Sequence, residues 1–110
     1  MDISTTSYKR CDLVKVTGRV DSASASRLEA ALQEILERKR YNIVLDLSGL
    51  EYISSAGLRA MVSTQKVCKE RGGQLVLAAI PEAIRDVLDL TGLDALFTAY
   101  PDVVSAVGSF

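Results

Sequence analysis

Hydrophobic and polar positions alternate in the first part of the chain. Residues 13–20 alternate in this way and are rich in β-branched side chains, which predicts a strand, and Gly18 within it marks a bend or bulge. A preceding strand is expected within residues 3–9. The connection between these two segments is short enough for an antiparallel hairpin.

The pattern then changes to a helical spacing. From residue 26 to about residue 40 apolar side chains recur every three or four positions, which predicts an amphipathic helix. Asp21, Ser22, Ser24 and Ser26 are candidate N-caps at its start, and Ser26 with Glu29 fits a capping box. Residues 43–47 are almost continuously apolar, as in strands that are covered on both faces. The period of two places one set of side chains on one face and the alternate set on the other: Ile43, Leu45 and Leu47 against Val44, Asp46 and Ser48.

The second half of the chain continues to alternate between helix and strand patterns. The predicted elements are a helix over about 55–71, a strand over 74–80, a helix over about 81–91, a strand over 96–100 and a short helix over 101–107. The order β-β-α-β-α-β-α-β-α predicts an α/β fold with a mixed, mostly parallel sheet of four to five strands flanked by about four helices. With 110 residues, a single domain over 1–110 is expected.

Composition narrows the function classes. The 13 basic and 14 acidic residues are balanced, and the basic run Arg38–Arg40 is explained by the dipole at the end of a helix, so we expect no nucleic-acid partner. The chain contains no histidine, which excludes Ser-His-Asp and Cys-His catalysis. Cys11 and Cys68 lack metal-ligand spacing and are expected to be reduced. We therefore expect no metal, no cofactor and no enzymatic activity.

The expected location is the cytoplasm. The first residues lack the basic and apolar regions of a signal peptide. The longest apolar run, residues 75–80, is too short to span a bilayer, so no membrane insertion is expected.

Candidate chemistry concentrates after the strand at 43–47. Ligands of such sheets bind at the carboxyl ends of the parallel strands, and the segment 48–55 is predicted to be a long polar loop at that edge. Ser54, Ser55 and Gly57 follow at the start of a helix, where free N–H groups and the dipole attract anions. The two serines could accept a phosphoryl group, bind an anion or only cap the helix.

Asp46 is expected to complete this site from the end of the incoming strand, with Ser48 on the same face. The segment is not a P-loop, because its glycine spacing is wrong and no lysine follows. It also lacks the acidic cluster and the lysine of a phosphate-receiver domain.

The stretches Asp46-Leu47-Ser48-Gly49-Leu50 and Tyr52-Ile53-Ser54-Ser55-Ala56-Gly57-Leu58 resemble the signature of STAS domains, and in particular of the bacterial anti-sigma factor antagonists. Residues 16–21 look like the Gly-x-hydrophobic-Asp segment of that family, and the element order matches from about residue 8 to the end. The resemblance implies the STAS fold. It also implies that an anti-sigma factor serine kinase phosphorylates the protein, that the unphosphorylated form binds this kinase, and that a PP2C-type phosphatase restores it.

Matched to this sequence, the phosphoacceptor is Ser55, two positions before Gly57, and Asp46 is the aspartate beside it. This match leaves Ser54 as the better candidate for the cap of the helix. Many antagonists have aspartate directly before the acceptor, whereas this chain has Ser54, which becomes a competing acceptor. Many have serine or threonine directly after it, whereas this chain has Ala56. The expected surroundings of the phosphosite are Asp46, Ser48 and Gly57. The expected partner surface consists of Asp21, Ser22, Ser54, Ser55, Ala56, Gly57 and Arg59.

Two other functions stay open. The chain could be a constitutive STAS scaffold, or a subunit of a stress-signalling or lipid-transport complex, that is never phosphorylated. It could also be a small nucleotide- or anion-binding protein that uses the same helix terminus, which the absence of a P-loop and of a metal cluster makes the weaker alternative.

Overall fold

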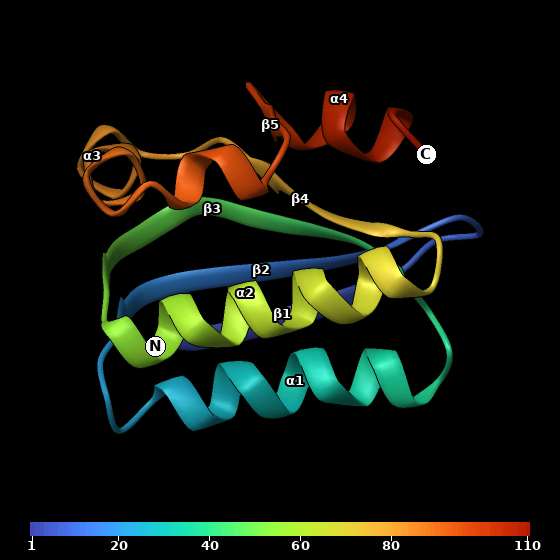
Figure 1. Cartoon of the computed structure of the whole chain (residues 1–110), viewed down its shortest axis with the longest axis horizontal. Coiled ribbons are helices and arrows are strands. Elements are labelled where there is room, and N and C mark those ends of the chain that lie inside the picture. The colour runs from blue at the N-terminus through green and yellow to red at the C-terminus, as the bar shows by residue number, and fades with distance from the viewer.

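The computed structural model describes all residues from 1 to 110 and contains one five-stranded sheet (Figure 1). The elements in chain order are β1 (Asp2–Ser7), β2 (Asp12–Val20), α1 (Ala25–Glu37), β3 (Asn42–Ile53), α2 (Ser55–Glu70), β4 (Gln74–Ala78), α3 (Glu82–Thr91), the 3₁₀ helix η1 (Leu93–Leu96), β5 (Ala99–Tyr100) and α4 (Val103–Gly108). The strand order is β1-β2-β3-β4-β5. β1 is antiparallel to β2 and the other neighbours are parallel, which confirms the predicted mixed α/β sheet.

The two faces of β3 belong to two cores, as the alternation of its side chains predicts. Leu45 and its neighbours on that face pack in a large core with residues of α1, α2 and α3, including Leu32 and Met61. Val44, on the opposite face, packs in a smaller core with Ala106 of α4. In Figure 1, α1 and α2 run side by side along the sheet, whereas the short α4 lies above β4 and beside β5. None of the helices is long and apolar enough to cross a membrane.

The start of α1 confirms Ser24 among the candidate N-caps and contradicts the predicted capping box. Asp21 closes a turn between β2 and α1, because its carboxylate accepts hydrogen bonds from the Ser24 backbone N–H at 2.8 Å and from the Ser24 hydroxyl at 2.9 Å. The helix therefore begins at Ala25, with Ser24 at the N-cap, and the predicted capping box of Ser26 and Glu29 is wrong. The Ser26 hydroxyl instead donates to the carbonyl of Ala23.

The predicted polar loop at 48–55 is also wrong, because β3 continues to Ile53. This second half of β3 pairs with β2 through two register shifts, and Gly49 lies opposite Thr17. A Cβ on Gly49 would stand 2.7 Å from the Thr17 Cγ2, so any larger residue there would force the Thr17 side chain to move. Leu50 and Ile53 both pack in the large core although they are three positions apart. In a regular strand such positions face opposite sides of the sheet, so the alternation of side chains does not predict a strand here.

The C-terminal elements are shorter than predicted. β4 ends at Ala78, and the following Ala79 has a positive φ of 55°. The segment 96–100 is a strand only at Ala99–Tyr100, since Leu93–Leu96 form η1.

Candidate functional site

The candidate site lies where β2 and β3 end together at the start of α2. Val20 pairs with Ile53, and the Ser54 N–H donates to the Val20 carbonyl at 2.7 Å. Ser54 alone connects β3 to α2. Gly57 allows this tight connection, because a Cβ there would stand 2.7 Å from the Ile53 Cγ1 and 2.9 Å from the Val20 Cγ1. The glycine of the motif therefore sets how closely α2 approaches the strand ends.

The two adjacent serines have different environments. Ser54 is the N-cap of α2, and its hydroxyl accepts a hydrogen bond from the Gly57 N–H at 3.2 Å. Ser54 is buried, with 8% of the residue's surface exposed. Ser55 is the first residue of α2 and is exposed to solvent. Ser54 thus has a capping role, as predicted, and Ser55 presents its hydroxyl at the positive end of the helix dipole.

A groove of about 410 Å³ begins at Ser55. It is lined by residues of α2 and of the segment where α3 ends: Ser55, Leu58, Arg59, Val62, Ser63, Thr91 and Leu93. The partly buried Val62 and Leu93 contribute apolar surface, and Arg59 is exposed on the rim. Arg59 was predicted from the sequence. Thr91 and Leu93 were not, because nothing in the sequence indicates that the end of α3 lies against α2.

Asp21 and Ser22 lie at the same edge of the sheet, directly after Val20, and both are exposed. Hydrogen bonds from the backbone N–H and the hydroxyl of Ser24 lower the pKa of Asp21 below its ordinary value. Asp21 therefore carries a negative charge near the start of α2 at physiological pH.

Asp46 and Ser48 lie elsewhere. Asp46 is in the middle of β3, opposite Lys15 and Ala78, and the expectation that it ends its strand is wrong. Asp46 pairs with Lys15 of β2. Lys15 lies five residues before Val20, which places Asp46 about 17 Å along the strand from the edge where Ser55 lies. Asp46 is 6% exposed, and its carboxylate accepts a hydrogen bond from the Ser48 N–H at 3.0 Å. The structure therefore does not bring this pair to Ser55.

The fold and this edge define a known class of domain. The STAS domain model matches residues 2–106, and the chain belongs to this family. BtrV of Bordetella bronchiseptica, whose name assigns it to the anti-sigma factor antagonists, is 36% identical over 93 residues, which cover 84% of this chain and 80% of the relative.

Solved structures agree with this assignment. The crystal structure of an anti-sigma factor antagonist from Mycobacterium paratuberculosis is 30% identical with a TM-score of 0.83, and the match covers 98% of this chain and 92% of that chain. The Bacillus cell fate determinant SpoIIAA, solved in its phosphorylated form, has a TM-score of 0.77 over 98% of each chain. At 14% identity, this likeness shows the fold alone.

Proposed function

We propose that the protein is an anti-sigma factor antagonist whose binding to an anti-sigma factor serine kinase is switched by phosphorylation of Ser55. The names of its relatives support the general role. The observation that supports the switch is the difference in exposure between the adjacent residues Ser54 and Ser55. Ser55 is exposed at the rim of the apolar groove, whereas the Ser54 hydroxyl is buried and bonded to the Gly57 N–H.

The fold is expected to tolerate a phosphate on Ser55. Phosphorylation adds about −1.5 to −2 charge at neutral pH. At a helix N-terminus this charge gains roughly 0.3–1 kcal/mol from the dipole. Asp46 is too far away to oppose it. Arg59 lies one helical turn from Ser55 on the same groove, so its guanidinium can pair with the phosphate.

Phosphorylation of Ser55 is expected to weaken binding of the partner kinase. A kinase seated on the groove would have to desolvate the dianion, and Arg59 would be engaged by the phosphate within its own chain. Mismatched charge across an interface costs several kcal/mol, and each ~1.4 kcal/mol changes affinity tenfold. A loss of roughly two to three orders of magnitude in affinity is expected. The unphosphorylated form therefore sequesters the kinase and the phosphorylated form releases it, until a PP2C-type phosphatase removes the phosphate.

The test uses a candidate anti-sigma factor serine kinase. The protein is incubated with the kinase and Mg-ATP, the phosphate is located by mass spectrometry, and binding is measured by calorimetry. Ser55→Ala is expected to abolish phosphorylation and retain binding, and Ser55→Asp is expected to weaken binding. Ser4→Asp is the matched control, because Ser4 is exposed on β1 opposite Lys15, away from the groove.

Two results would contradict the proposal. Phosphate found on Ser54 would assign the switch to the other serine. Unchanged binding by Ser55→Asp would favour a constitutive scaffold or complex subunit. The Ser54→Ala variant tests whether Ser54 is only the helix cap. It is expected to lower the free energy of unfolding by about 1 kcal/mol through loss of the cap, and Ser55 should still be phosphorylated.

A further inference from the structure

A second hollow, of about 420 Å³, lies at the opposite end of the sheet, where β3 and β4 begin. The β1–β2 turn, the α1–β3 connection, the α2–β4 turn and Phe110 form its walls. The sixteen residues of α2 separate it from Ser55, which corresponds to about 24 Å. The hollow is therefore separate from the proposed partner groove, and the inference drawn from it does not depend on the proposed function.

The charge of this hollow is one-sided. Its lining holds five of the thirteen lysine and arginine side chains of the chain and none of its fourteen aspartate and glutamate side chains, and the one acidic group there is the α-carboxylate of Phe110. These cations are Lys9, Arg10, Lys39, Arg40 and Arg71. Arg40 forms an ion pair with Asp12 at 3.1 Å, the only ion pair in the structure. The other four cations have no carboxylate partner, although the chain as a whole has a net charge of −1.

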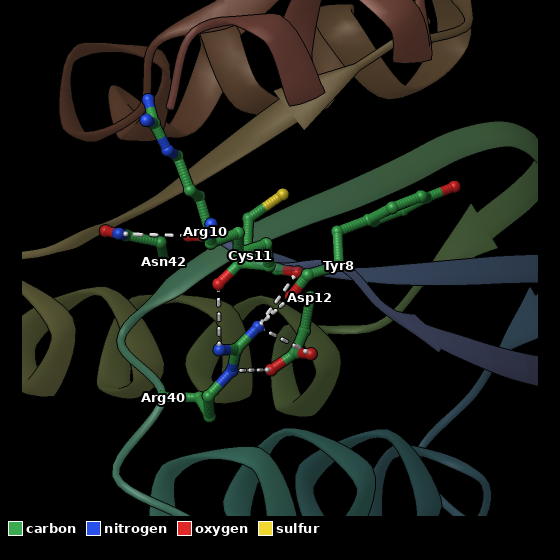
Figure 2. Close-up of polar contacts among 7 residues, drawn as sticks. Tyr8, Arg10, Cys11, Asp12, Arg40 and Asn42 are labelled. Carbon is green, nitrogen blue, oxygen red and sulfur yellow. Dashed lines mark hydrogen bonds and ion pairs between the residues drawn. The ribbon is translucent and has the colours of Figure 1, made fainter.

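Arg40 makes the hollow rigid (Figure 2). Its guanidinium donates to the carbonyl oxygens of Tyr8, Lys9 and Cys11 and to both carboxylate oxygens of Asp12. These bonds fasten the β1–β2 turn to the α1–β3 connection. The backbone of two walls of the hollow is thus held in place before any ligand arrives, which lowers the entropic cost of binding.

Lys39 occupies a position where glycine is the usual residue. It follows the end of α1 with a φ of 61°, and the N–H groups of Lys39 and Arg40 close the helix onto the carbonyls of Leu36 and Ile35. The equivalent position after α2 is Gly72, with a φ of 83°. Only glycine adopts this conformation without strain. The chain therefore retains a cationic side chain in the hollow at a position that disfavours any side chain.

We propose that this hollow binds a small ligand with two or more phosphoryl groups. Arginine and lysine are the side chains that bind phosphate, arginine through paired hydrogen bonds and lysine as a point charge. A volume of about 420 Å³ is in the range of small-molecule sites. The four cations line one concave surface and come from three separate segments, which favours a compact ligand over an extended one. The Tyr41 ring lies 5.9 Å from the Arg71 guanidinium and adds a planar surface to the same wall.

The test is calorimetric titration of the full chain with inorganic triphosphate and, separately, with ATP. Both are expected to bind in a saturable manner that weakens as salt is raised. Tighter binding of ATP would identify a nucleotide, and equal binding would identify the phosphate chain alone as the recognised group. Either result supports a phosphoryl site.

Matched variants localise the binding. Lys39→Gly removes a cation and relieves the positive φ, so it is expected to fold at least as well as the parent chain and to bind about tenfold more weakly, the equivalent of one hydrogen bond to a charged group. Arg71→Gln is expected to show a similar loss. Lys66→Gln, on the exposed side of α2, is the control and should change nothing.

Three results would overturn the inference. The first is the absence of saturable binding by either ligand. The second is an equal loss in Lys66→Gln and Lys39→Gly, which would indicate nonspecific charge attraction. The third is tighter binding of a short DNA duplex than of either small ligand, which would assign the cations to an extended nucleic-acid surface.

Discussion

Replacing Arg40 by methionine tests whether the stability of the fold depends on a single guanidinium at the amino end of the sheet. Asp12 is 1% exposed, and Arg40 is its only ionic partner. Breaking a buried ion pair from one side costs about 3–5 kcal/mol, because the remaining charge stays buried. The Arg40 side chain is itself 31% exposed, so water can partly replace it, and we expect a loss of about 2–3 kcal/mol.

The assay is urea denaturation at neutral pH, with stability taken from the linear extrapolation. Arg38→Met is the control, because Arg38 is exposed in the same connection, and it should change stability by no more than about 0.5 kcal/mol. Asp12→Asn combined with Arg40→Met completes a double-mutant cycle. The double variant should lose less than the sum of the single variants, because it buries no unpaired charge. A loss below about 0.5 kcal/mol in Arg40→Met, or strict additivity in the cycle, would refute the reasoning.

Two further perturbations test the α2–β4 region. Gly73→Ala would place a Cβ 2.2 Å from the Tyr41 carbonyl oxygen, so a loss of roughly 3 kcal/mol or more is expected in thermal unfolding, whereas Gly108→Ala in α4, with no atom within 4 Å of its Cβ, should be neutral or stabilising. Burial raises the pKa of Cys68 from its ordinary 9.0 to about 11. Between these values the unfolded chain loses the thiol proton and the folded chain keeps it, so stability should fall as pH rises from about 9 to 11. A Cys68→Ala variant should lose this part of the pH dependence, and a profile that stays unchanged would contradict the assignment.

The sheet and its helices could be predicted because their apolar residues keep a regular period. The alternation from Ile43 to Leu47 correctly separated the two faces of β3. The second half of the same strand was missed because two register shifts move Leu50 and Ile53 out of phase. One of these shifts follows Gly18, where the sequence correctly predicted a bend or bulge, whereas the other, next to the pair of Gly49 and Thr17, depends on the distant strand and had no local signal.

The candidate site shows the same division between local and distant information. The capping role of Ser54 depends only on the first turn of α2, and the sequence indicated it. The placement of Asp46 depended on where β3 ends, and that error followed from the missed second half of β3. The second wall of the groove, at Leu93, required knowledge of helix packing. The basic run Arg38–Arg40 was explained by the helix dipole alone, whereas in the structure Arg40 pairs with Asp12, which is distant in sequence.

The way α2 is anchored indicates how a switch at Ser55 can act. The buried side chain of Gln65 donates to the carbonyls of Leu75 and Leu96, at 3.0 and 2.8 Å, and accepts from the Leu75 N–H at 2.7 Å. These bonds connect the middle of α2 to β4 and to the end of η1, and Met61 and Cys68 pack on either side in the large core. Moving α2 would leave several buried polar groups without partners, each at a cost of about 1–3 kcal/mol. That cost exceeds the roughly 0.3–1 kcal/mol that a phosphate gains from the helix dipole. Phosphorylation of Ser55 is therefore expected to change the charge of the groove and leave the helix where it is.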